Sequence, residues 1–302
     1  MISVIMPAYN CEQYVEAAIK SILEQTHKDL ELLIADDASK DNTKKIIDDL
    51  AKTDPRIKTF HNDNNLGYLQ ASNKLFEKCS GEYITFQDAD DFSDRTRFEK
   101  LLNEFNKDKE LKCVGSNSFS FSDDIKTVKA SNFPLSYNEI KEKYLTGIVM
   151  TGSALMIKKE VTDKIGLYNL FFDRIGAEDI YWYGLIIERF KTINIAEALY
   201  YYRQSPTSVS RSHKNPLANV SHDFCMLAYS NRLKGKQDVV AEATKDEQKY
   251  IGKKLLAEYY IKKGEFKNAF KYLAKLIPSF YKLNFLFYKL FARQTIYHLI
   301  RV

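Results

Sequence analysis

The chain has 302 residues, of which 45% are apolar and 28% are charged, an ordinary balance for a folded globular protein. Its net charge of +5 is uneven, because residues 245–302 carry 13 Lys or Arg against 4 Asp or Glu and the rest of the chain is slightly acidic. This distribution excludes a nucleic-acid binder with a distributed basic face, and it predicts that the basic C-terminal segment meets an anionic surface.

The N-terminal third alternates between apolar strands and amphipathic helices. Short β-rich apolar runs predict strands over residues 3–6, 30–35, 57–60 and 83–86. Helical periodicity and helix-capping residue types predict helices between them, over 14–25, 41–50 and 69–78. Because strands that alternate with helices form parallel, doubly wound sheets, the sequence predicts an α/β fold with a mostly parallel sheet flanked by helices.

Beyond residue 91 the pattern is less regular. It predicts helices over 97–105 and 179–189, strands over 113–121, 153–157 and 198–203, and a mixture of loop and helix over 131–151. Pro216 marks a predicted domain boundary, and the pattern is helical from residue 221 onward. Within that region, residues 255–263 and 266–277 predict a helical hairpin that turns at Gly264.

Three carboxylates, Asp88, Asp90 and Asp91, follow the strand predicted over 83–86. Carboxylates this close repel one another unless a divalent cation or a polyvalent ligand compensates their charge. Oxygen ligands suit Mg²⁺ or Mn²⁺, and the carboxyl end of a strand is where α/β sheets bind ligands. The alternatives are a solvated acidic turn and a phosphatase of the D-x-D-G-T type, and the second is disfavoured because Asp91-Phe92-Ser93 stands where Gly-Thr is needed.

Polar segments follow the other strands at the same predicted edge. Tyr9, after Pro7, could stack on a nucleobase, although a turn with a partly buried tyrosine is the plainer explanation. Asp37, the second of two adjacent aspartates, could accept hydrogen bonds from a base or a ribose, and the alternative is a polar loop with a helix cap. Gly67, two residues after Asn65, permits a tight turn before a helix whose first amides could face a phosphate or a sugar.

Glu178 and Asp179 stand at the start of a predicted helix. The helix macrodipole stabilises acidic groups there, so capping is the plain explanation. The functional interpretation is a general base. The two are compatible, because capping can hold a carboxylate in place.

Taken in order, these segments resemble the inverting nucleotide-sugar glycosyltransferases of family 2, which have the GT-A fold. The resemblance covers roughly residues 1–211, about two-thirds of the chain. It is carried by SVIMPAYN at 3–10, DDASKDNT at 36–43, Asn65-x-Gly67-x-x-x-Ala71-x-Asn73, GEYI at 81–84 leading to Asp88-Ala89-Asp90-Asp91, Glu178-Asp179, and Tyr202-Arg203 followed by Ser208-Val209-Ser210. Each motif is loose, but their order and spacing make the combination specific.

The resemblance implies a role for each matching residue. Tyr9 and Asp37 would hold the nucleotide base, the first by stacking and the second by a hydrogen bond. Asp88 would contact the ribose or the metal, and Asp90 would ligate the metal that bridges the diphosphate. Asp179 would be the catalytic base.

Other matching residues would act around these. Arg203 and the loop over 208–211 would close over the diphosphate, and His213 would either approach the metal or remain a solvated loop histidine. Asp91 would have a supporting role, and Arg95 stands where the family often carries a proline in a D-D-x-x-x-P-x-R run. The remaining candidates are Pro7, Asn65 and Gly67 for the nucleotide, with Glu178 and Ser210 as secondary site residues.

The activity implied by the resemblance is transfer of a sugar, hexosyl or N-acetylhexosaminyl, from a UDP-type donor to an acceptor hydroxyl, with inversion and with Mn²⁺ or Mg²⁺ as cofactor. A glycan or lipid-linked glycan acceptor in bacterial surface polysaccharide assembly would fit. One alternative is a sugar nucleotidyltransferase, against which residues 7–16 contain no Gly, Arg or Lys. The other is a non-catalytic sugar-nucleotide binder, against which the intact metal and base candidates count.

The predicted organisation is a GT-A domain over 1–215, followed by a helical, basic and aromatic extension over 216–302. Within the first domain, 1–110 would bind the nucleotide-sugar, and 111–215 would carry the acceptor side and the base. Scattered cysteines, no basic leader and no apolar run of ~18 residues predict a cytoplasmic protein without a signal peptide or a membrane span.

The segment over 266–302 contains seven Lys or Arg, many aromatic residues and no acidic residue. Such a helix can lie on an anionic membrane surface, here the inner face of the cell membrane. The alternative is packing against the catalytic domain or against a second subunit of a homodimer.

Overall fold

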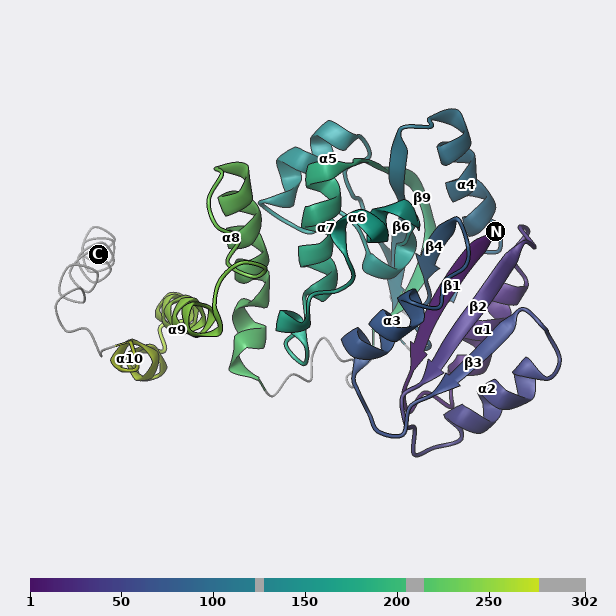
Figure 1. Ribbon diagram of the computed structural model, residues 1–302, viewed down its shortest axis with the longest axis horizontal. Helices are drawn as coiled ribbons and strands as arrows, with labels where there is room; N and C mark the ends of the chain where they lie inside the picture. Colours follow the sequence, from purple (N-terminus) through teal and green to yellow (C-terminus); the bar gives the residue numbers. More distant parts are fainter. Residues whose placement is uncertain (123–127, 205–214, 277–302) are drawn as a thin grey trace.

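The computed structural model describes residues 1–122, 128–204 and 215–276 (Figure 1). Its first part alternates strand and helix as predicted. The elements are β1 (Ile2–Ala8), α1 (Val15–Leu23), β2 (Leu30–Asp36), α2 (Thr43–Ala51), β3 (Ile57–His61), α3 (Tyr68–Phe76) and β4 (Tyr83–Phe86). Each predicted strand and helix of this part is confirmed, with ends that differ by a few residues.

The second part departs more from the prediction. Its elements are β5 (Phe92–Ser93), α4 (Arg97–Lys107), β6 (Leu111–Phe121), β7 (Val128–Ala130), α5 (Tyr137–Tyr144), the 3-10 turn η1 (Gly152–Ala154), β8 (Leu155–Lys158), α6 (Glu160–Ile165), the 3-10 turn η2 (Leu170–Phe172), α7 (Glu178–Arg189) and β9 (Lys191–Arg203). The strand predicted from residue 153 begins at Leu155, because residues 152–154 form a 3-10 turn instead. The strand predicted from residue 198 begins at Lys191.

The described strands form one sheet in the order β3-β2-β1-β4-β8-β6-β9-β5, with β7 paired to β6. Strands β1 to β4 pair in parallel, as predicted. β8 runs antiparallel to β4, with Tyr83 opposite Lys158 and Thr85 opposite Met156. The start of β8 therefore lies at the edge of the sheet where β4 ends, and this places the η1 turn beside the residues that follow β4.

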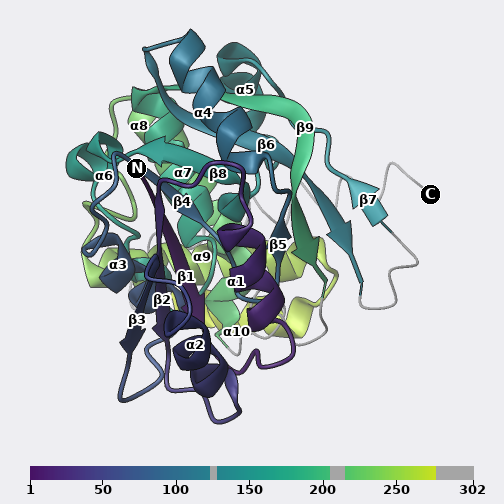
Figure 2. The ribbon, with the colours of Figure 1, turned by 90° about the vertical axis from the view of Figure 1, so that its right-hand side faces the viewer.

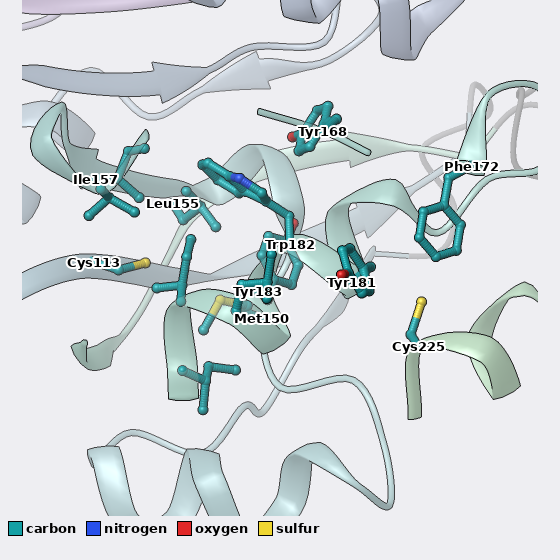
Figure 3. Close-up of a cluster of buried hydrophobic side chains, with 14 of the residues drawn as sticks. Cys113, Met150, Leu155, Ile157, Tyr168, Phe172, Tyr181, Trp182, Tyr183 and Cys225 are labelled. Atoms are coloured by element: carbon teal, nitrogen blue, oxygen red, sulfur yellow. The ribbon is translucent and has the colours of Figure 1, made fainter. Parts of the chain in front are cut away.

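Helices cover both faces of the sheet because successive strand residues point to opposite sides (Figure 2). On β1, Val4 and Met6 belong to a core cluster with residues of α1, α2 and α4. Ile5 belongs to the other cluster, which includes residues of α3, α5 and α7. Figure 3 shows part of this second cluster, with Trp182 of α7 among the labelled side chains.

The C-terminal helices are η4 (Pro216–Val220), α8 (Ser221–Leu233), α9 (Lys245–Lys262) and α10 (Phe266–Ala274). Phe224 and Tyr229 of α8 are buried in the same cluster as Trp182, so α8 shares a core with the sheet. α9 and α10 lie beyond α8, away from β1–β3 (Figure 1). Gly264, with a φ of +74°, lies between them and confirms the predicted hairpin.

Most of the segment predicted to meet a membrane, residues 277–302, lies outside the described residues. The described helices include none that combines the length and the apolar character needed to span a bilayer. Phe266 and Phe270 of α10 are 58% and 61% exposed, one helical turn apart. The four cysteines are free and buried, in agreement with their scattered spacing.

Candidate active site

The carboxyl ends of β1 and β2 bring two predicted base-binding residues together. Ala8 pairs with Asp36 in the sheet. The N–H of Asp37 donates to the carbonyl of Ala8 at 2.8 Å, so Tyr9 and Asp37 begin neighbouring loops. Tyr9 is 47% exposed, so its ring is accessible to a planar ligand at this edge.

Asp37 is buried, and its carboxylate holds the loop that precedes α3. Oδ1 accepts hydrogen bonds from the side-chain amide of Asn62 at 2.8 Å and from the N–H of Leu66 at 2.9 Å. Oδ2 accepts from the N–H of Gly67 at 2.7 Å. This loop-fixing role is not apparent from the sequence, and the contact of Asp37 with a base stays a prediction.

Arg174, which the sequence analysis did not single out, reaches the same loop from the segment before α7. Its guanidinium donates to the carbonyl and to the side-chain oxygen of Asn65, both at 2.8 Å. A Cβ added at Gly67 would lie 2.9 Å from the Cζ of Arg174, and the φ of +90° there also favours glycine. Arg174 therefore joins the predicted nucleotide loop to the segment that leads into Asp179.

Asp88 lies at the end of β4, where three hydroxyl groups surround it. Its Oδ2 accepts from the hydroxyl of Ser153 at 2.5 Å, and its Oδ1 accepts from Tyr68 at 3.2 Å. Its backbone N–H donates to the hydroxyl of Tyr200 at 3.1 Å. Burial, and then the negative charge of Asp90, raise the pKa of Asp88 to about 6. The structure therefore holds a partly desolvated carboxylate in a fixed position.

Arg203, at the end of β9, contacts the acidic loop that follows β4, residues 88–91. Its backbone N–H donates to Oδ1 of Asp91 at 2.7 Å, and its Nε donates to the carbonyl of Asp90 at 2.8 Å. The guanidinium lies 4.2 Å from the ring centroid of Tyr14. Ser210 and His213, the other two predicted residues of this region, lie outside the described residues.

The acidic loop has the chemistry of a partial metal site. Asp91 is 2% exposed, and its Oδ2 has no hydrogen-bond partner among the described residues. Burial and the charges of Asp88 and Asp90 raise the pKa of Asp91 well above its ordinary value. Within residues 1–122, 128–204 and 215–276, no group of three or more His, Cys, Asp or Glu side chains forms a complete metal site. The carboxylates of Asp88 and Asp90, with phosphate oxygens and water as the other ligands, would nevertheless suit Mg²⁺ or Mn²⁺.

Glu178 and Asp179 form the first turn of α7, after a loop in which Ala177 has a φ of +71°. Oδ1 of Asp179 accepts from the N–H of Ile180 at 2.7 Å, and Oδ2 accepts from the hydroxyl of Tyr183 at 3.2 Å. Burial raises the pKa of Asp179 despite these donors. Burial, and then the charge of Asp179, raise the pKa of Glu178. For this pair, desolvation therefore outweighs the stabilisation that acidic groups gain at a helix N-terminus.

Comparison with known proteins identifies the family. The family model described as Glycosyl transferase family 2 matches residues 3–166, more than half of the chain. The chain belongs to this family.

Two relatives illustrate the match. TuaG of Bacillus subtilis, whose name assigns it to teichuronic acid biosynthesis, is 31% identical to this family 2 glycosyltransferase over 219 residues, which cover 70% of the chain and 81% of TuaG. A glycosyltransferase of Haemophilus influenzae is 32% identical over 209 residues, which cover 69% of the chain and 78% of the relative. Family membership decides against the nucleotidyltransferase and the non-catalytic binder.

Solved structures confirm the fold of this family 2 glycosyltransferase. Residues 1–349 of S. aureus TarS, solved in complex with UDP-GlcNAc, superpose with a TM-score of 0.60 at 16% identity, over 89% of each chain. The mannosyltransferase PcManGT from Pyrobaculum calidifontis, solved with GDP-Man and Mn²⁺, gives a TM-score of 0.57 at 16% identity, over 92% of this chain and 75% of that one. The predicted GT-A fold with helices at its C-terminus is therefore confirmed.

A buried arginine that the sequence pattern did not single out lies beside the acidic loop. Arg97 of α4 is 0% exposed, and burial lowers the pKa of its guanidinium to about 10. The guanidinium donates to the hydroxyls of Thr85 and Ser93, both at 2.8 Å, and to the carbonyls of Phe86 at 3.2 Å and Ser153 at 2.5 Å. The sequence signal that could have identified Arg97 is its position as the final arginine of the D-D-x-x-x-P-x-R run.

Proposed function

We propose that the protein transfers a sugar from a nucleotide-sugar, of the UDP type, to an acceptor hydroxyl with inversion at the anomeric carbon. In this proposal Tyr9 and Asp37 hold the base, Asp88 and Asp90 face the diphosphate, and Asp179 is the catalytic base. The observation that carries the proposal is geometric. Ser153 donates to Oδ2 of Asp88, and a Cβ added at the preceding residue, Gly152, would lie 2.7 Å from Oδ2 of Asp179, so two adjacent residues lie against the two carboxylates.

Tyr68 supports this placement. Its hydroxyl donates to Asp88, and its own pKa is raised by burial and then by the charges of Asp88, Glu178 and Asp179, among other groups. Tyr68 therefore contacts the acidic loop after β4 and lies close enough to the start of α7 for the charges there to act on its hydroxyl. A donor diphosphate bound at the acidic loop would meet an acceptor hydroxyl bound at the start of α7.

The reaction that follows is a single displacement. The acceptor hydroxyl attacks the anomeric carbon, and its proton goes to the carboxylate of Asp179 as the new bond forms. The bond to the diphosphate breaks, and its electron pair leaves with the diphosphate. A divalent ion held by Asp90 and Asp88 would supply compensation for that charge when bound. A raised pKa suits Asp179 as a base, because it strengthens the affinity of the carboxylate for the proton.

The donor and the acceptor are proposed from two kinds of support. TarS was solved with UDP-GlcNAc, which supports a UDP donor carrying a hexosyl or N-acetylhexosaminyl group, and PcManGT was solved with GDP-Man, which keeps GDP as the competing donor. The name of TuaG supports an acceptor in surface polysaccharide assembly. Contact of residues 266–302 with an anionic membrane, a cytoplasmic location and a homodimer stay predictions.

The test is an assay of the purified full-length chain with UDP-sugars and GDP-mannose, in Mn²⁺ and in EDTA. We expect release of UDP from a UDP-sugar, faster in Mn²⁺, and transfer to an added glycan acceptor. Release of GDP alone would overturn the UDP assignment. An equal rate in EDTA would overturn the metal assignment.

The variant Glu178→Gln tests whether burial raises the pKa of Glu178, and it does so through the stability of the folded protein. A carboxyl whose pKa is raised on folding stabilises the folded protein below its ordinary pKa of 4.5, and this contribution is lost as the pH rises through the raised value. Glutamine does not ionise, so we expect the variant to unfold with a free energy about 1 kcal/mol higher than wild type at pH 8, and with no gain near pH 4. Urea denaturation at both pH values measures this, with Glu142→Gln on the exposed face of α5 as the control. A gain that is equal at both pH values would contradict the expectation.

A further inference from the structure

One short turn contacts both halves of the candidate site. The η1 turn, Gly152–Ala154, lies between the acidic loop after β4 and the start of α7. Ser153 hydrogen-bonds to Asp88, and the space above Gly152 is filled by Tyr183 and Asp179. Neither turn residue belongs to the acidic motifs that pointed to the site.

On the donor side, Ser153 is fixed from two directions. It is 6% exposed, and its hydroxyl donates to Oδ2 of Asp88 at 2.5 Å. Its carbonyl accepts from the guanidinium of Arg97 at 2.5 Å. Because Arg97 is itself tied to Thr85 and Ser93, the hydroxyl of Ser153 has a defined position from which to orient the carboxylate.

On the base side, Gly152 is required by close packing. A Cβ added there would lie 2.2 Å from the hydroxyl oxygen of Tyr183 and 2.7 Å from Oδ2 of Asp179. Real Cβ atoms do not approach other heavy atoms this closely, so Tyr183 or Asp179 would have to move. The missing side chain thus provides the room in which the hydroxyl of Tyr183 donates to the carboxylate of Asp179 at 3.2 Å.

We propose that the Gly152–Ser153 turn positions the two carboxylates of the reaction relative to one another, with Ser153 orienting Asp88 for the donor and Gly152 admitting the Tyr183–Asp179 pair. This rests on the proposed function. Ser153, Gly152 and Tyr183 are positioning residues, because each acts through a carboxylate. The two ends of the turn therefore control different steps, donor binding at Ser153 and turnover at Gly152.

The donor end is tested with Ser153→Ala. Loss of a hydrogen bond to a charged group is expected to weaken UDP binding, measured by calorimetry in Mn²⁺, about tenfold. The matched control is Ser116→Ala, since the hydroxyl of Ser116 is buried without a hydrogen-bond partner among the described residues. The control is expected to keep the wild-type affinity. Unchanged UDP affinity in Ser153→Ala, or equal weakening in the control, would overturn the role of Ser153.

The base end is tested with Tyr183→Phe and Gly152→Ala. Both are expected to lower kcat about tenfold or more, with UDP affinity within twofold of wild type. If Gly152→Ala does not fold, kcat is measured on the double variant Gly152→Ala/Tyr183→Phe. This variant lacks the hydroxyl that would lie 2.2 Å from the new Cβ. The double variant should recover part of the lost stability while kcat stays low, since Oδ2 of Asp179 remains 2.7 Å from the Cβ.

The inference would be overturned if Tyr183→Phe keeps the wild-type kcat. It would also be overturned if Tyr183→Phe and Gly152→Ala lose as much UDP affinity as they lose kcat. Failure of the proposed function looks different. In that case Asp179→Asn itself would transfer sugar at the wild-type rate, whatever the turn variants do.

Discussion

Replacing Asp179 with Asn is expected to lower the rate of sugar transfer by about 10²–10⁴-fold, because in the proposed mechanism an amide cannot take the proton of the acceptor hydroxyl. The amide oxygen can still accept from the N–H of Ile180, and the amide NH₂ in the place of Oδ2 can donate to the hydroxyl oxygen of Tyr183, so the start of α7 should keep its conformation. The affinity for UDP should stay near that of wild type, because the proposed mechanism places Asp179 on the acceptor side. Steady-state rates with a saturating donor, together with calorimetry of UDP binding, measure the two effects.

The control for this variant is Asp163→Asn on α6, an exposed aspartate whose ion pair with Lys159 spans 3.5 Å. It makes the same chemical change outside the site, and it is expected to leave the rate of transfer unchanged. If the folded Asp179→Asn protein keeps the wild-type rate, Asp179 is not the base. Glu178, its desolvated neighbour, would then be the residue to replace.

Replacing Asp90 with Asn is expected to remove most of the advantage that Mn²⁺ gives to UDP binding. The carboxylates of Asp88 and Asp90 lie close enough for the charge of one to raise the pKa of the other, an arrangement that a divalent cation relieves. We expect UDP affinity in Mn²⁺ to fall toward the value in EDTA, and the transfer rate to fall about 10²-fold or more. Calorimetry in both buffers gives the comparison directly.

Asp246→Asn is the matched control, since that side chain is 94% exposed on α9, in the C-terminal region. It should show the wild-type difference between Mn²⁺ and EDTA. A folded Asp90→Asn protein that keeps this difference would show that the cation, if bound, is held elsewhere. The same measurement on Asp88→Asn separates a metal contact from a contact with the ribose, because only the first makes affinity depend on Mn²⁺.

Much of this architecture is predictable from the sequence because its signals are local. Strands β1 to β4 are short apolar runs, and the helices between them carry apolar residues at helical spacing, so each element is encoded within its own residues. The edge at which Tyr9, Asp37 and Asp88 gather follows from one rule, that parallel strands end together. The loop-fixing role of Asp37 was not predictable in this way, since its partners Leu66 and Gly67 are about thirty residues away.

The sequence by itself is enough to locate the acidic segments after β4 and at the start of α7, and to predict the order of the elements that present them. The tertiary structure alone decided how Asp88 is held, because its partners come from distant parts of the chain, and it also brought Gly152 against Asp179. Ser153 is 65 residues from Asp88, and it reaches that carboxylate because β8 runs antiparallel to β4 and begins where β4 ends. A parallel strand in that place would put the Gly152–Ser153 turn at the opposite edge of the sheet. Strand direction is set by packing over the whole sheet, and so no local pattern could reveal the turn that joins the two carboxylates.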